Sequence, residues 1–178
     1  MRKLGFLFSG QGSQAVGMGK GFYESSPFAR EAFALADEIL GFKISRLCME
    51  GPEEDLRLTQ NTQPALLIVS YIACHLLGLE PSMAAGHSLG EYSALVAAGS
   101  LKFEDAILLV HKRGKYMQEA TPVGVGAMAA VLGVEYMAVN QALDKVKEGV
   151  VEIANWNSKE QVVIAGHEQA VKEALSLM

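Results

Sequence analysis

A serine flanked by glycines stands between a short apolar run and an alanine-rich segment. Residues 86–90 read GHSLG, which fits the pattern G-x-S-x-G. In this pattern the glycines allow a strained strand-to-helix turn that exposes the serine hydroxyl above a sheet. Such a serine can attack a carbonyl carbon and hold the acyl group as an ester. Short patterns also arise by chance, so this interpretation of Ser88 requires a strand before the turn and a helix after it.

An attacking serine also needs donors for the oxyanion that forms on the carbonyl. The N–H of Leu89, at the expected start of a helix, is one candidate, because the helix dipole favours negative charge there. The loop at 10–19 (GQGSQAVGMG) offers a second, since glycines on both sides of Gln11 let its backbone N–H turn toward a neighbouring strand end. A plain strand-to-helix turn without chemistry is the alternative. A dinucleotide fingerprint does not fit, because Ala15 stands where its third glycine belongs.

One arginine lies beside the apolar stripe of a predicted helix over 103–118. The stripe is centred near Val110, and Arg113 falls about 60° from that centre at roughly 100° per residue. An unpaired buried charge is very costly, so this guanidinium must meet a carboxylate. The partner is either a protein Asp or Glu, or a substrate carboxylate held by two hydrogen bonds. The residue pattern leaves both open.

A serine nucleophile needs a base within hydrogen-bond reach, and the four histidines are poor candidates. His87 should point away from Ser88 along the strained turn. His75 is expected inside a buried helix, and His111 on the side of its helix away from the apolar stripe. His167 falls in a turn of the C-terminal region. The sequence therefore indicates a nucleophile without a convincing base.

Strands and helices must alternate to position these residues. We predict strands over 4–9 and 82–86, and helices over 26–40, 62–77, 87–99 and 103–118. The helix from Thr62 is apolar nearly all round and should be buried. After Pro122 we predict strand, helix, strand, strand and helix over 126–133, 135–147, 150–157, 161–166 and 167–178.

The second series has the order of a ferredoxin-like domain without its last strand. The predicted fold class is therefore α/β, with a large domain containing a parallel sheet over 1–124. An incomplete ferredoxin-like α+β small domain follows over 125–178.

Composition narrows the function classes. A net charge of -5 and a pI of about 5.4 exclude a general nucleic-acid binder, which needs clustered Lys and Arg. The longest apolar stretch, 65–79, is too short for a membrane span, and the run at 4–8 is too short for a signal peptide. Cys48 and Cys74 lack metal or disulfide spacing and should be buried thiols in a reducing compartment. We therefore expect a cytoplasmic protein without a metal site or membrane partner.

Taken together, the motifs resemble the malonyl-CoA:acyl carrier protein transacylases over essentially the whole chain. The segments that carry the resemblance are GQGSQ at 10–14, GMG at 17–19, TQPA at 62–65, GHSLGEYSAL at 86–95, RGKYMQEA at 113–120, GAMAAVLG at 126–133, ANWNS at 154–158 and QVVIAG at 161–166. The resemblance implies an α/β-hydrolase-like large domain with a ferredoxin-like insertion. It also implies transfer of malonyl from malonyl-CoA to the phosphopantetheine thiol of acyl carrier protein, in fatty acid or polyketide synthesis, without a permanently bound cofactor.

By position, the resemblance makes Ser88 the acylated nucleophile and Arg113 the clamp on the malonyl carboxylate. The backbone N–H groups of Gln11 and Leu89 become the oxyanion hole. The remaining substrate-binding candidates are Gln63 and His87.

The family's histidine base comes after the small domain, in a stretch that this chain does not contain, so we expect the 178-residue chain alone not to be a competent enzyme. Two other functions stay open: a serine hydrolase or thioesterase with the same turn, and a naturally short, non-catalytic chain that binds coenzyme A or a partner. Arg113 favours the malonyl transferase, because an uncharged acyl group needs no cation.

Overall fold

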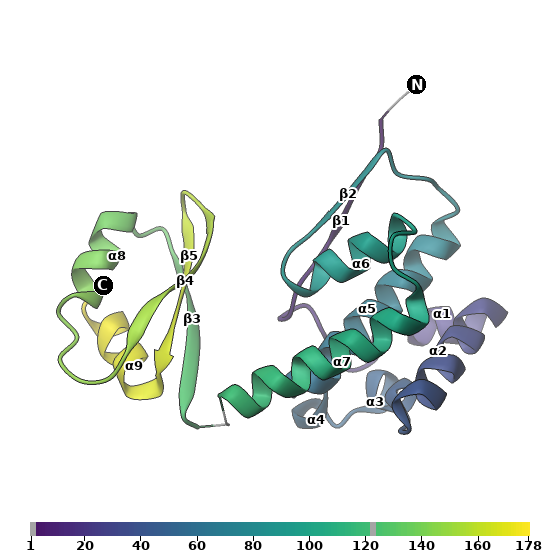
Figure 1. Ribbon diagram of the computed structural model, residues 1–178, viewed down its shortest axis with the longest axis horizontal. Helices are drawn as coiled ribbons and strands as arrows, with labels where there is room; N and C mark the ends of the chain where they lie inside the picture. The colour runs from purple at the N-terminus through teal and green to yellow at the C-terminus, as the bar shows by residue number, and fades with distance from the viewer. Residues whose placement is uncertain (1–2, 122–123) are drawn as a thin grey trace. The chain divides into compact units, whose positions relative to one another are not determined.

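The computed structural model describes residues 3–121 and 124–178. The chain divides into two compact units, Met1–Glu119 and Ala120–Met178, and the elements of the described residues are drawn in Figure 1. Pro122, after which the second series of elements was predicted to begin, lies outside the described residues. The predicted α/β class with a parallel sheet is confirmed.

A parallel strand pair organises the first unit. Strand β1 (Gly5–Phe8) pairs with β2 (Met83–Gly86), and Phe8 lies opposite Gly86 at the carboxyl ends. The helices between them are α1 (Lys20–Ser25), α2 (Pro27–Leu40), α3 (Ile44–Glu50), α4 (Glu53–Arg57) and α5 (Thr59–Leu77). Since the carboxyl ends of parallel strands share one edge, the loop after β1 and the turn after β2 meet there.

Two further helices follow β2. Helix α6 (Leu89–Ala97) packs along β2 and α5, and α7 (Phe103–Ala120) ends the unit. On α7 the buried residues include Phe103, Ile107 and Val110, as the helical stripe predicted. Met117 was placed in the same stripe, but its side chain is 43% exposed. The buried stripe therefore ends before the last turn of α7.

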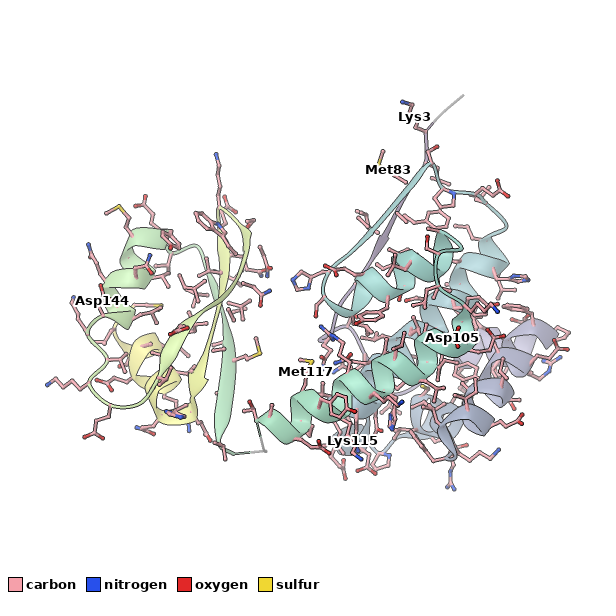
Figure 2. The ribbon with its side chains drawn as sticks, viewed as in Figure 1. Lys3, Met83, Asp105, Lys115, Met117 and Asp144 are labelled. Atoms are coloured by element: carbon pink, nitrogen blue, oxygen red, sulfur yellow. The ribbon has the colours of Figure 1, made fainter. Side chains whose placement is uncertain are left out.

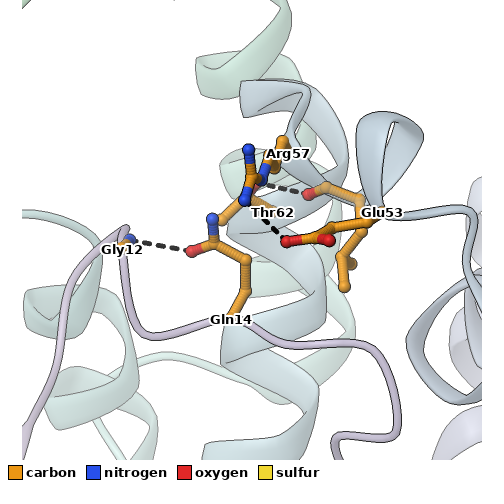
Figure 3. Close-up of polar contacts among 6 residues, drawn as sticks. Gly12, Gln14, Glu53, Arg57 and Thr62 are labelled. Atoms are coloured by element: carbon orange, nitrogen blue, oxygen red, sulfur yellow. Dashed lines mark hydrogen bonds and ion pairs between the residues drawn. The ribbon is translucent and has the colours of Figure 1, made fainter.

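The start of α5 differs from the prediction. The helix begins at Thr59, so Pro64 lies inside it rather than in its first turn. Thr62, expected to open the helix, instead donates from Oγ1 to the Leu56 carbonyl at 2.6 Å, one of the contacts drawn in Figure 3. The helix is not buried throughout, since Leu77 near its end is 55% exposed.

Both cysteines are free. Cys48 is buried, and loss of solvation, with a smaller contribution from the Asp37 charge, raises the pKa of its thiol to about 12. Cys74 is only half-buried, so the expectation of two buried thiols holds for Cys48 alone. Its pKa is also raised by burial.

The second unit has the predicted β-α-β-β-α order. It comprises β3 (Gly126–Leu132), α8 (Tyr136–Leu143), β4 (Val151–Ser158), β5 (Gln161–His167) and α9 (Glu168–Ser176). The sheet is antiparallel with strand order β3-β5-β4. Its core includes Val131 from β3, Val139 from α8 and Ile164 from β5. Helix α8 ends four residues earlier than the predicted Lys147, and turns follow it.

The only tryptophan of the chain reports on this second unit. The Trp156 ring stacks on Tyr136 with centroids 4.6 Å apart and planes 6° apart.

We expect Tyr136→Ala to destabilise this unit by about 1 kcal/mol, because the ring contact is lost, and to shift the tryptophan emission. Urea denaturation followed by that emission measures both effects. Tyr116→Ala, which removes an exposed ring from the first unit, should leave the curve unchanged; equal effects of the two variants would contradict the assignment.

Candidate active site

Ser88 occupies a strained turn between β2 and α6. Its φ of 54° and ψ of -104° make it the non-glycine residue with positive φ within 3–121 and 124–178. Such a conformation costs about 1–3 kcal/mol and persists only where the surroundings impose it. The required context is present, because β2 ends at Gly86 and α6 begins at Leu89. The His87 N–H also donates to the Phe8 carbonyl at 3.1 Å, which ties the turn to β1.

The two flanking glycines are required by close backbone contacts. A Cβ on Gly86 would lie 1.9 Å from the carbonyl carbon of Gly90, and a Cβ on Gly90 would lie 2.2 Å from the Phe8 carbonyl oxygen. Neither neighbour is a flexible side chain. The turn can therefore close only without side chains at these two positions.

Gly86→Ala should consequently displace the turn and destabilise the first unit by at least about 1–3 kcal/mol, because the new methyl group overlaps the backbone. Thermal unfolding followed by circular dichroism measures the loss. Gly21→Ala is the matched control, since its Cβ meets nothing within 4 Å inside helix α1. An unfolding midpoint unchanged by Gly86→Ala would contradict this description of the turn.

Arg113 lies next to the serine hydroxyl. Its Nη2 donates to Ser88 Oγ at 3.0 Å and its Nη1 donates to Gln63 Oε1 at 2.8 Å. Its Cζ lies 5.7 Å from the centroid of the Tyr92 ring, within cation-π range. The ion pairs of the described residues do not include Arg113. The sequence left two partners open for Arg113, a protein carboxylate and a substrate carboxylate. Among the described residues, no protein carboxylate forms an ion pair with it.

Gln63 fixes the far side of the guanidinium. Its side chain is fully buried, and its Nε2 donates to Gln11 Oε1 and to Met117 Sδ, each at 3.3 Å. These contacts leave the amide oxygen facing Arg113. Figure 2 shows Met117 and Lys115 projecting from different sides of α7. Met117 was missed as a site neighbour, although its place four residues after Arg113 on one helix was an available signal.

The loop that carries Gln11 is braced at several points. The Gly12 N–H donates to Gln14 Oε1 at 2.8 Å (Figure 3), and Ser13 Oγ donates to the Gly10 carbonyl at 2.9 Å. A Cβ on Gly10 would lie 2.7 Å from the His87 carbonyl oxygen, so this loop contacts the serine turn directly. The oxyanion-hole roles of the Gln11 and Leu89 N–H groups stay predictions.

Three histidines have partners away from Ser88. His75 is exposed rather than buried, because it lies in the solvent-exposed last turn of α5. Its ring stacks on Phe28 with the two ring centroids 3.5 Å apart. His111 Nδ1 donates to the Gln60 carbonyl at 3.0 Å. His167 Nδ1 accepts from the Val150 N–H at 3.0 Å. None of these contacts prepares an imidazole to take the Ser88 proton.

Within residues 3–121 and 124–178, no group of three His, Cys, Asp or Glu side chains could hold a metal ion. No helix in the same part of the chain has both the length and the apolar character required to cross a membrane.

Comparison with known proteins gives matches over nearly the whole chain. A family described as "Acyl transferase domain" matches residues 5–178. Among curated proteins, the malonyl CoA-acyl carrier protein transacylase of Bacillus subtilis is 51% identical over 99% of this chain. That of Escherichia coli strain K12 is 49% identical over 98%.

Solved structures agree with the sequence matches. A malonyl-transacylase in complex with a type II PKS acyl-carrier protein superposes with a TM-score of 0.91 at 42% identity, over 99% of this chain and 59% of that chain. The malonyl-CoA:acyl carrier protein transacylase of Xanthomonas oryzae gives 0.91 at 47% identity, over 99% and 58%. The chain likewise spans 57% and 58% of the length of the two curated relatives.

Proposed function

We propose that this chain, which belongs to the acyl transferase domain family, takes part in moving a malonyl group from coenzyme A to the phosphopantetheine thiol of acyl carrier protein, in fatty acid or polyketide synthesis. The observation that carries the proposal is the Arg113 guanidinium, bonded to Ser88 Oγ at 3.0 Å and without a carboxylate among its described partners. A cation beside the nucleophile suits an acyl group that bears its own carboxylate.

The relatives support the same reaction. Those compared above carry names of malonyl CoA-acyl carrier protein transacylases, and one solved relative is in complex with an acyl-carrier protein. Both facts favour a thiol acceptor over water, and therefore transfer over hydrolysis. The serine hydrolase and the non-catalytic binding chain find no comparable support.

In the proposed mechanism Ser88 Oγ attacks the thioester carbonyl while a base takes its proton. The N–H groups of Gln11 and Leu89 hold the oxyanion, which collapses to an ester as the base passes its proton to the departing coenzyme A sulfur. The carrier thiol then attacks the ester carbonyl while the base takes the thiol proton, and the base gives this proton to Ser88 Oγ as the ester bond breaks. No metal or bound cofactor takes part in these steps.

Arg113 has a second task in this scheme. In the structure its two terminal nitrogens donate hydrogen bonds to Gln63 and Ser88, whereas a malonyl carboxylate would accept two hydrogen bonds from the guanidinium. Substrate binding therefore frees Ser88 Oγ from Arg113 in the step that anchors the acyl group. The base is a group other than His75, His111 and His167, which are engaged elsewhere.

We further assign 1–124 to the large acyltransferase domain and 125–178 to the small ferredoxin-like domain. The cytoplasm is the proposed location, and the two free thiols favour a reducing compartment.

A transfer assay tests the proposal. The protein is mixed with malonyl-CoA and holo acyl carrier protein, and the carrier is examined by mass spectrometry for malonyl on its phosphopantetheine. Imidazole is added in a parallel series as an external base. Malonylated carrier that depends on both the protein and imidazole is the expected result; release of free malonate without carrier modification would indicate a hydrolase instead.

A further inference from the structure

Helix α5 contains a carbonyl that its own helix cannot satisfy. Pro64 has no N–H, so the carbonyl of Gln60, four residues earlier, lacks its intrahelical donor. His111 on α7 lies 3.0 Å away through Nδ1. Because a carbonyl only accepts, the imidazole carries a proton on Nδ1. A side chain from α7 thus replaces the bond that Pro64 removes from α5.

The two helices touch again three residues along α7. A Cβ on Gly114 would lie 2.6 Å from the Cα of Gln60 and 2.6 Å from the Thr59 carbonyl oxygen. Backbone therefore meets backbone at Gly114. His111 and Gly114 face the same turn of α5, because residues three apart share one side of a helix.

Arg113 lies between these two contacts along α7. It reaches Gln63, which is three residues after Gln60 on the same side of α5. The bond from Arg113 Nη1 to Gln63 Oε1, at 2.8 Å, therefore depends on how α7 is placed along α5. That placement also determines whether Nη2 reaches Ser88 Oγ, 3.0 Å away.

We propose that His111 is a positioning residue for Arg113. Its bond to the Gln60 carbonyl, together with the contact at Gly114, fixes α7 on α5 and so fixes the guanidinium beside Ser88. The effect of this positioning on acyl selectivity rests on the proposed function, in which Arg113 receives the malonyl carboxylate. The placement of the guanidinium beside Ser88 does not depend on the proposed function.

The variants test the hydrogen bond from His111 Nδ1 to the Gln60 carbonyl. His111→Phe keeps a ring but cannot donate, whereas His111→Asn offers an amide N–H near the Nδ1 position. Pro64→Ala restores the N–H that Gln60 lacks, so the loss of folding stability caused by His111→Phe should be smaller in that background. Leu109→Phe, at an exposed position of the same helix, is the matched control.

The first readout needs no catalysis. The Nε–Hε signal of Arg113 in a nitrogen-proton correlation spectrum, assigned with Arg113→Lys, should shift or broaden in His111→Phe. It should stay near its original position in His111→Asn and Leu109→Phe. A signal unmoved in His111→Phe, or moved equally in His111→Phe and His111→Asn, would overturn the proposal.

The second readout is the ratio of Ser88 acylation rates with malonyl-CoA and acetyl-CoA, each measured with imidazole present as an external base. It should fall about tenfold in His111→Phe and recover in His111→Asn. A merely structural role would lower the unfolding midpoint and leave this ratio unchanged. If the Arg113 signal moves as expected while wild type shows no malonyl acylation, the proposed function fails and the positioning role stands.

Discussion

Replacing Ser88 by alanine is expected to lower malonyl acylation of the protein by at least about 10³-fold. The variant removes the only atom of this residue that can form the ester, and the remaining donors can only polarise the thioester. Acylation is measured as the rate of coenzyme A release from malonyl-CoA, with imidazole present as an external base. The fold should survive, because serine and alanine both carry a Cβ, so the substitution adds no steric cost at the positive φ of this residue.

Ser100→Ala is the matched control for this variant, since Ser100 is an exposed serine on the turn after α6. It should acylate at the wild-type rate. Equal rates for Ser88→Ala and wild type would show that the ester forms on another residue, and would end the nucleophile assignment.

Replacing Arg113 by alanine is expected to reduce acylation by malonyl-CoA by about 10²- to 10³-fold, while acylation by acetyl-CoA changes far less. Truncating one partner of a hydrogen-bonded charge pair typically costs about 2–5 kcal/mol, and only the malonyl group supplies the second charge. Arg113→Lys should recover little, because an ammonium cannot reproduce the two parallel bonds of the guanidinium.

Two controls separate this effect from loss of folding. Lys112→Ala removes an exposed cation one residue earlier and should leave both rates unchanged. Arg113→Ala also leaves Gln63 Oε1 without its 2.8 Å donor, so its unfolding midpoint must be measured alongside. An equal fall with both thioesters would contradict a role in carboxylate recognition.

The serine turn could be predicted because all of its signals are local. The strand, the glycines and the helix occupy one short stretch, and the structure places β2 and α6 on either side of Ser88. The same holds for α2, where Ser26 accepts from the Ala29 N–H and Gly41 ends the helix at positive φ. Patterns confined to a few neighbouring residues need no knowledge of the tertiary fold.

Short helices and long-range partners could not be predicted in this way. Helices α1, α3 and α4 have six, seven and five residues, too few to show a helical period. The partners of Arg113 lie 25 and 50 residues away in the chain. Helical geometry placed this arginine beside the core but could not choose between a protein carboxylate and a substrate, because that choice depends on how α5, α6 and α7 pack.

Errors in the histidine assignments have the same origin. The apolar run of α5 suggested that His75 is buried, but the last turns of the helix extend beyond the core, and the ring is exposed. For His111 the helical pattern predicts only a position away from the apolar stripe. Its bond to Gln60 arises from Pro64, a residue interpreted as the start of α5 until the structure placed it inside the helix.

The most direct test of the central claim is intact mass spectrometry of the protein after incubation with malonyl-CoA, followed by peptide mapping of any adduct. Wild type, Ser88→Ala and Arg113→Ala are compared, each with malonyl-CoA and with acetyl-CoA and with imidazole present. We expect a malonyl ester on Ser88 in wild type, none in Ser88→Ala, and a selective loss of the malonyl adduct in Arg113→Ala. A malonyl adduct on any other residue, or no adduct with malonyl-CoA in wild type, would contradict the claim that Ser88 and Arg113 together accept a carboxylated acyl group.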